Sequence, residues 1–177
     1  MNRKLKLWEL NRSSIADFKQ QEKFPIYLIL DNIRSLNNVG TFFRTADAFN
    51  VDKLFLCGIT ATPPHREIHK TALGATESVE WEYHEDCAAL IEQLKSEGVI
   101  ICSIEQTEET TFLQTLPIEN GKKYAIVMGN EVDGVQQAII DASDHIVEIP
   151  QFGTKHSLNV SVCAGVVLWE FVRFYAK

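Results

Sequence analysis

The sequence lacks paired cysteines and long apolar runs, and each absence excludes a class of protein. Its four cysteines, Cys57, Cys87, Cys102 and Cys163, stand singly within apolar segments. Without a CxxC pair we expect neither a disulfide framework nor a zinc site, and the cysteines are typical of small core residues in a reducing compartment. No segment reaches the roughly 18 consecutive apolar residues of a membrane helix, and no signal-peptide core follows the N-terminus. We therefore expect a soluble, cytoplasmic protein that does not bind membranes.

Common fingerprints of nucleotide binding and hydrolysis are also missing. The chain has no GxGxxG, no GxxxxGK and no GxSxG motif. His65 and His69 have the i,i+4 spacing of metal ligands, but Pro63 and Pro64 precede them and oppose a helix there. Because no third ligand stands out, we expect no metal site.

Acidic residues outnumber basic ones, and the net charge is −7. This balance argues against a polyanionic partner, because nucleic-acid affinity depends on contacts of Lys and Arg with phosphates. Residues 1–25 nevertheless hold six basic side chains against three acidic ones. Two interpretations of this arm remain open: a solvated leader helix, or a segment that contacts RNA. Trp8 and Phe18 within it favour docking of the arm onto the body over stacking on bases.

Short β-rich segments alternate with helical patterns along the rest of the chain. Strands are expected at 26–30, 53–58, 99–104, 124–129 and 145–149, with another near 79–81. Helices are expected over 39–46, 65–73, 87–97, 135–142 and 158–175. This alternation predicts an α/β fold with a mostly parallel sheet flanked by helices. The 177 residues suffice for one substantial core, so we expect a basic arm at 1–23 and one domain at 24–177.

The last expected helix is apolar on nearly all sides, although Glu170 and Arg173 interrupt the pattern. Such a helix needs cover on more than one side. A partner subunit and complete burial within one chain both remain open as the source of that cover.

Three polar segments follow strands: DNIRSLNNVG after 26–30, GNEVDG after 124–128, and PQFGTKHSLN after 145–149. Ligands of open α/β sheets bind beyond the carboxyl ends of the strands. We therefore predict that all three segments line a single pocket. Glycines at 40, 129, 134 and 153 either let backbone approach a ligand or serve ordinary turns.

Several polar residues in these segments are candidates for chemistry. Arg44 faces away from the apolar stripe of its helix, so it either pairs with Asp47 on the surface or reaches a phosphate or alkoxide. Glu131 follows a buried strand, where its carboxylate must be stabilised by backbone N–H groups or by a cation. The alternative is that Glu131 caps a helix that begins near Val132.

Near the last helix, Ser157 is a candidate cap, and Asn159 is expected inside the first turn. Amide and hydroxyl groups at that point can hold a substrate sugar or the arginine.

The three segments resemble the motifs of the SpoU family of RNA ribose 2′-O-methyltransferases, in the SPOUT class, and the resemblance spans roughly residues 24–175. The matching residues are Asn38, Gly40 and Arg44; Gly129, Glu131 and Gly134; and Ile149, Pro150, Gly153, Ser157, Leu158 and Asn159. Gln151 departs from the methionine that is common in the family. The resemblance implies a C-terminal trefoil knot, an S-adenosylmethionine site and a homodimer packed through the last helix.

By the same resemblance, residues can be assigned to cofactor and substrate. The cofactor is expected to contact Ile104, Glu105, Gln106, Gly129, Ile149, Pro150 and Leu158. Arg44 is expected to stabilise the forming alkoxide, because a guanidinium stays protonated in proteins. We expect the arginine and the ribose to be oriented by four side chains: Asn38, Glu131, Ser157 and Asn159.

The expected substrate is transfer RNA, with ribosomal RNA as the alternative. Two other functions remain open: an RNA-binding protein of this fold without catalysis, and an unrelated nucleotide-binding module.

Overall fold

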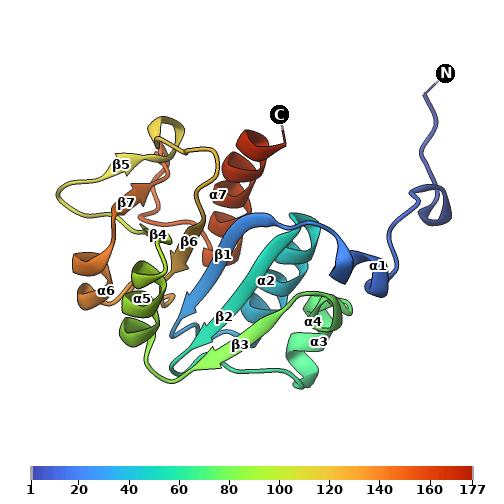
Figure 1. The fold of residues 1–177 in the computed structure, drawn as a ribbon, viewed down its shortest axis with the longest axis horizontal. Coiled ribbons are helices and arrows are strands. Elements are labelled where there is room, and N and C mark those ends of the chain that lie inside the picture. Colours follow the sequence, from blue (N-terminus) through green and yellow to red (C-terminus); the bar gives the residue numbers. More distant parts are fainter. Residues whose placement is uncertain (1, 177) are drawn as a thin grey trace.

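The computed structural model describes residues 2–176 and shows one twisted sheet covered by helices on both faces (Figure 1). Its seven strands have the order β3-β2-β1-β6-β4-β7-β5, and every neighbouring pair is parallel. They are β1 (Phe24–Asp31), β2 (Val51–Cys57), β3 (Trp81–His84), β4 (Ile100–Ile104), β5 (Thr111–Phe112), β6 (Tyr124–Met128) and β7 (His145–Glu148). The predicted α/β fold with a mostly parallel sheet is confirmed.

Seven α-helices surround the sheet within the described residues. They are α1 (Ile15–Gln20), α2 (Leu36–Ala48), α3 (Arg66–Ala72), α4 (Ala75–Ser78), α5 (Cys87–Ser96), α6 (Gln137–Ala142) and α7 (Val160–Tyr175). Single 3-10 turns lie at Leu7–Glu9 and Leu113–Thr115. No helix of residues 2–176 is long and apolar enough to cross a membrane.

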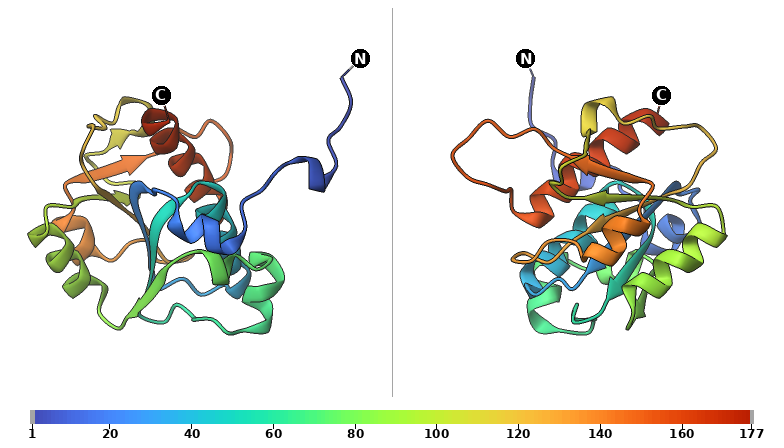
Figure 2. Two further views of the ribbon diagram at one scale, coloured as in Figure 1. Left: turned by 45° about the vertical axis from the view of Figure 1, so that its right-hand side comes forward. Right: turned by 90° about the vertical axis from the view of Figure 1, so that its left-hand side faces the viewer.

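The two faces of the sheet carry separate cores because side chains alternate along each strand. On one face, Leu28 and Leu30 of β1 pack in the larger core with α2, α3 and α7. On the other, Ile29 packs with α5 and α6 (Figure 2). Central β6 is buried at all five positions, as expected for a parallel strand covered on both sides.

Several expected boundaries are corrected. The strand expected near 79–81 runs from Trp81 to His84, because Val79 ends α4. The helix expected from 135 begins at Gln137, and the last helix begins at Val160 instead of Leu158. Strand β5 was not expected, because two residues carry no readable period. The C-terminal knot stays a prediction.

The N-terminal arm is partly docked and partly extended from the body (Figure 1). Phe18 of α1 is half-buried, and Lys23 Nζ lies 3.2 Å from the centre of its ring. Lys23 Nζ in turn donates to Oδ1 of Asn50 on the body at 2.8 Å. The side chain of Trp8, in contrast, is 75% exposed, although Lys6 Nζ lies 5.0 Å from its ring centre. The expected docking therefore holds for the segment around Phe18 and is wrong for Trp8.

Helix α7 buries one face and exposes another. Ala164, Leu168 and Phe171 are fully buried, whereas Val162 and Trp169 are each 56% exposed. The all-round apolar pattern is therefore only partly covered by the chain's own sheet.

Candidate active site

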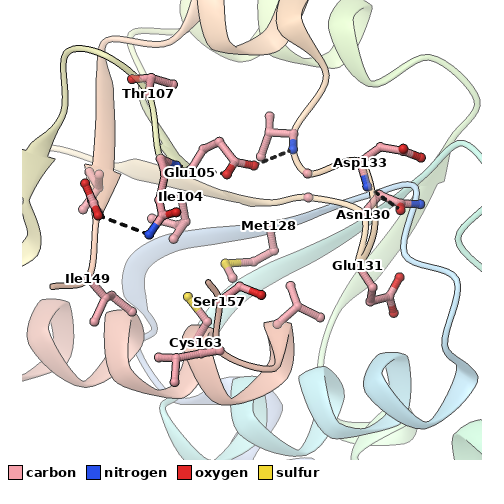
Figure 3. A pocket seen from close by; sticks show the side chains of 18 of the residues that line it. Ile104, Glu105, Thr107, Met128, Asn130, Glu131, Asp133, Ile149, Ser157 and Cys163 are labelled. Atoms are coloured by element: carbon pink, nitrogen blue, oxygen red, sulfur yellow. Dashed lines mark hydrogen bonds between the residues drawn. The ribbon is translucent and has the colours of Figure 1, made fainter. Parts of the chain in front are cut away.

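A cavity of about 680 Å³ opens at the carboxyl ends of β4, β6 and β7 (Figure 3). Six residues expected to contact the cofactor line it: Ile104, Glu105, Gln106, Gly129, Ile149 and Leu158. Pro150, the seventh, does not line it. The second and third polar segments therefore share one pocket as predicted, whereas the first segment is not part of its lining.

The lining of the cavity combines apolar side chains with carboxylates. Met128, Ile149 and Cys163 contribute apolar surface, and burial raises the pKa of the Cys163 thiol to about 11. Four carboxylates line the cavity, from Glu105, Glu131, Asp133 and Glu148, and the lining contains no Lys, Arg or His. Such a cavity favours a ligand that has both an apolar part and a positive charge.

Gly129 is required by close packing against backbone, and Gly134 is required by its left-handed backbone conformation. A Cβ on Gly129 would lie 2.2 Å from the nitrogen of Val135, a contact that the backbone cannot relieve by a side-chain rotation. Gly134 has φ +71° and a Cβ there would lie 2.1 Å from Oε2 of Glu105. The loop is closed by two backbone hydrogen bonds of 3.0 Å between Asn130 and Gly134.

Gly153 differs from these two glycines, because a Cβ there would meet nothing within 4 Å. Its presence in the third motif is not explained by packing within the chain.

Glu131 ties the second polar segment to the first. Its carboxylate accepts hydrogen bonds from the backbone N–H of Arg34 at 2.9 Å, the backbone N–H of Ser35 at 3.0 Å and Nδ2 of Asn38 at 2.9 Å. Partial burial opposes ionisation, but these hydrogen bonds outweigh it and lower the pKa of Glu131. The expectation that backbone N–H groups satisfy this carboxylate is confirmed.

The alternative that Glu131 caps a helix beginning near Val132 is wrong. The helix on its C-terminal side, α6, begins only at Gln137, and the N–H groups bound by Glu131 precede α2, whose cap is Ser35.

Asn159 joins the same network from the third segment. Its Oδ1 accepts from the backbone N–H of Ser161 at 3.0 Å and of Val162 at 3.3 Å, so Asn159 is the N-cap of α7. Its Nδ2 donates to Oδ1 of Asn38 at 3.3 Å. Asn38, in the first turn of α2, therefore lies between Glu131 and Asn159. These three residues, one from each polar segment, form the polar cluster.

The expected positions of Ser157 and Asn159 are corrected by this geometry. Asn159 is the cap instead of a first-turn residue, and Ser157 lies outside the helix, where it is exposed and lines the cavity. The hydroxyl of Ser157 bonds no other residue of 2–176 and is free to bind a substrate.

Arg44 does not join the cavity within one chain. It is exposed on the solvent side of α2, as expected, but it does not line the cavity and makes no ion pair or hydrogen bond with residues 2–176. The pairing with Asp47 is also absent, and the carboxylate of Asp47 instead accepts a hydrogen bond from the hydroxyl of Ser78.

Sequence reasoning missed Glu148 and the positioning role of Glu105. The carboxylate of Glu105 accepts from the backbone N–H of Val135 at 3.0 Å, and Gln106 Nε2 donates to Glu148 at 3.2 Å. These bonds connect the loops after β4, β6 and β7. The position of Glu148 could have been found from the sequence, because it ends a strand whose carboxyl end faces the pocket.

Of the histidine pair His65 and His69, the first has a structural role. His65 caps α3, accepting at Nδ1 from the backbone N–H of Glu67 at 3.2 Å, and the helix begins directly after it. The helix expected over 65–73 is therefore confirmed, and the expectation that Pro63 and Pro64 oppose a helix at the histidines is wrong. No group of three or more His, Cys, Asp or Glu side chains suited to a metal ion occurs within residues 2–176.

Comparison with known proteins identifies the relatives of the chain. The model of the SpoU rRNA Methylase family matches residues 25–169. A protein named 23S rRNA (guanosine-2'-O-)-methyltransferase RlmB, from Neisseria meningitidis, is 36% identical over 150 residues, which are 84% of this chain and 58% of the relative. The chain thus spans less than two thirds of that relative's length.

Solved structures share the fold. The AdoMet-bound rRNA methyltransferase from Sinorhizobium meliloti superposes with a TM-score of 0.80 at 24% identity, covering 89% of this chain and 60% of the other. The A. aeolicus TrmH/SpoU tRNA modifying enzyme gives a TM-score of 0.79 at 23% identity, covering 90% and 81%.

Proposed function

The chain belongs to the SpoU rRNA Methylase family, and on that premise we propose that it transfers a methyl group from S-adenosylmethionine to a ribose 2′-hydroxyl of RNA. The observation that carries the proposal is the polar cluster of Asn38, Glu131 and Asn159 beside a cavity at the carboxyl edge of the sheet. Three segments that are far apart in the chain converge there on one site.

The cavity suits the proposed cofactor. Its volume of about 680 Å³ lies within the range of small-molecule sites, and Ile149 and Leu158 offer apolar surface to a base. The carboxylates of the lining suit a cation, because the sulfonium and ammonium groups of S-adenosylmethionine outweigh its single carboxylate and leave it with a net positive charge. When bound, the cofactor supplies a methyl group on that positively charged sulfur.

The chain's residues would position the ribose and support its attack. With the cofactor bound, the ribose hydroxyl would accept the methyl group from the sulfonium, leaving a neutral thioether, and its proton would pass to solvent. We assign Ser157 to hold the ribose, because its hydroxyl is free and faces the cavity (Figure 3). Asn38, Glu131 and Asn159 hold the surrounding loops in place, which keeps the reacting groups aligned.

We assign Arg44 to the forming alkoxide, and we propose that it acts in the cavity of a second copy of this chain. Arg44 has no partner within its own residues 2–176. Helix α2 packs against α7, and the ring of Trp169 on α7 lies 6.4 Å from that of Phe49 at the end of α2. A subunit docked on the exposed face of α7 would therefore also reach α2.

The homodimer itself is open to a direct test. We expect Trp169→Glu to convert a dimer into a monomer, because it places a charge in the middle of the apolar face of α7. Sedimentation equilibrium measures the mass. Phe112→Glu is the matched control, since Phe112 is also an exposed aromatic side chain but lies on edge strand β5. A wild-type protein that sediments as a monomer contradicts the proposed dimer.

We propose ribosomal RNA as the substrate in place of the transfer RNA favoured by the sequence. The support is the relative from Neisseria meningitidis, whose name states 23S rRNA. An enzyme with this substrate would act in the cytoplasm, where ribosomes are assembled. We also propose that residues 1–23 form an arm that assists RNA binding, outside the catalytic domain at 24–177.

The function is tested with labelled cofactor and transcribed, unmodified RNA. We expect calorimetry to detect S-adenosylmethionine binding, and we expect label to enter 23S rRNA at ribose 2′-oxygens and to enter transfer RNA weakly or not at all. Nuclease digestion followed by mass spectrometry locates the label. Label on bases would refute the proposed acceptor, and no binding at millimolar cofactor would refute the methyltransferase proposal.

A further inference from the structure

We propose that three exposed cations, Arg34, Arg66 and Lys155, form a docking surface for the phosphate backbone of the RNA. The proposal rests on the proposed function, because it names the surface through which that RNA reaches the site. The three residues are called the cationic rim below.

The rim stands out through its lack of partners. Residues 24–176 contain ten Lys and Arg side chains, and five of them lie within 4.0 Å of a carboxylate: Lys53, Lys70, Lys95, Lys123 and Arg173. The other five, within the same residues, have no such partner: Arg34, Arg44, Arg66, Lys122 and Lys155. Four of these five are on segments that flank the candidate active site, and Lys122 is the exception.

The positions of the rim residues follow from contacts of their segments. The backbone N–H of Arg34 donates to Glu131 of the polar cluster at 2.9 Å. Lys155 lies in the loop between Ile149 and Asn159, both of which line the cavity.

Arg66 is the first residue of α3, which follows the carboxyl end of β2. The loop before α3 is held at that edge of the sheet, because the hydroxyl of Thr60 accepts from the backbone N–H of Ile33 at 2.9 Å. Helix α3 then packs beside the first turn of α2, where the hydroxyl of Thr71 donates to the carbonyl of Asn37 at 3.1 Å.

Lys122 provides an internal contrast. It is exposed and unpaired like the rim residues, but it precedes β6 and so lies at the amino edge of the parallel sheet, opposite the site.

Phosphate is the partner that this arrangement fits. Two carboxylates adjoining the rim are engaged: Glu67, next to Arg66 in sequence, pairs with Lys70 at 3.8 Å, and Glu131, which binds the N–H of Arg34, accepts three hydrogen bonds. The cavity itself, with four carboxylates, repels a polyanion. Cations around an acidic cavity would hold the RNA backbone across its mouth and leave one ribose to enter, and phosphate contacts of this kind position nucleic acid without reading its sequence.

The test compares RNA binding of glutamine variants at several salt concentrations. The probe is a transcribed fragment of 23S rRNA, titrated between 50 and 200 mM KCl. Each phosphate contact contributes about 0.7–0.9 to the slope of log affinity against log salt. We expect the variant R34Q/R66Q/K155Q to lose about two units of slope and each single variant to bind about threefold more weakly at low salt, while K122Q binds like the wild type.

Cofactor binding by calorimetry separates this proposal from the proposed function. All variants are expected to bind S-adenosylmethionine as the wild type does. A triple variant with the slope and affinity of K122Q overturns the rim, even if methyl transfer is found. So does a triple variant whose only change is its mass in sedimentation, because the rim would then be a contact between two copies. A wild type that binds cofactor but no RNA overturns both proposals.

Discussion

Replacing Arg44 with alanine is expected to lower the rate of methyl transfer about a hundredfold to a thousandfold, the usual cost of removing one preorganised group that stabilises developing negative charge. Binding of S-adenosylmethionine should be unchanged, because Arg44 is assigned to the ribose oxygen of the RNA and not to the cofactor. Single-turnover rates with labelled cofactor measure the first effect, and calorimetry measures the second. Arg44→Lys keeps the positive charge but loses the planar guanidinium. We therefore expect its rate to lie between that of Arg44→Ala and that of the wild type.

Mixing two inactive variants shows which subunit supplies the arginine. Leu158→Arg places a large side chain in the cavity, so this variant should lose cofactor binding but retain Arg44. If the arginine acts in the partner's cavity, a mixed dimer with Arg44→Ala contains one complete site. Random mixing should then restore about a quarter of wild-type activity, because half of the dimers are mixed and each has one of two sites.

The mixing experiment has a clear contrary outcome. No recovery in mixtures that sedimentation shows to exchange subunits would place Arg44 in its own chain's site. Full activity of Arg44→Ala alone would remove the arginine from the mechanism altogether.

The second large effect is expected from Gly129→Ala. The added Cβ would lie 2.2 Å from the nitrogen of Val135 and 2.3 Å from the carbonyl carbon of Gly134, so the loop that lines the cavity must shift. Overpacking of this kind costs about 1–3 kcal/mol. If that cost falls on the bound conformation, affinity for S-adenosylmethionine drops about tenfold to a hundredfold, as measured by calorimetry.

Gly153→Ala is the matched control for that variant. Gly153 belongs to the third motif, yet its Cβ position is open and its φ is not in the left-handed region. We expect cofactor affinity within about twofold of the wild type. Equal losses in both variants would show that motif glycines act through chain flexibility instead of through close packing.

Much of the fold was predictable because burial imposes a period on the sequence. The run 124–128 is apolar throughout since β6 is covered on both faces, and Cys87, Leu90, Ile91 and Leu94 follow the buried stripe of α5. Edge strands β3 and β5 were misplaced or missed. They are short and only partly covered, so little alternation is imposed on them.

The site was predictable as a place but not as a set of contacts. Loops after parallel strands must lie at one edge of the sheet, so the convergence of GNEVDG with the segment after β7 followed from order along the chain. The partners of Glu131 did not follow, because the N–H groups of Arg34 and Ser35 are nearly a hundred residues away in sequence. The finding that Asn159 and not Ser157 caps α7 depended on where α7 begins, which backbone angles decide.

The order and period of the side chains were enough to predict the parallel α/β class, the motifs of the family and the edge of the sheet at which they gather. Three features required the folded chain: Asn38 bridges Glu131 and Asn159, Gly129 is crowded while Gly153 is free, and Arg44 lies outside its own cavity. The reason is physical: hydrogen bonds and steric contacts between distant segments depend on ångström-scale positions in three dimensions, which a one-dimensional pattern does not contain.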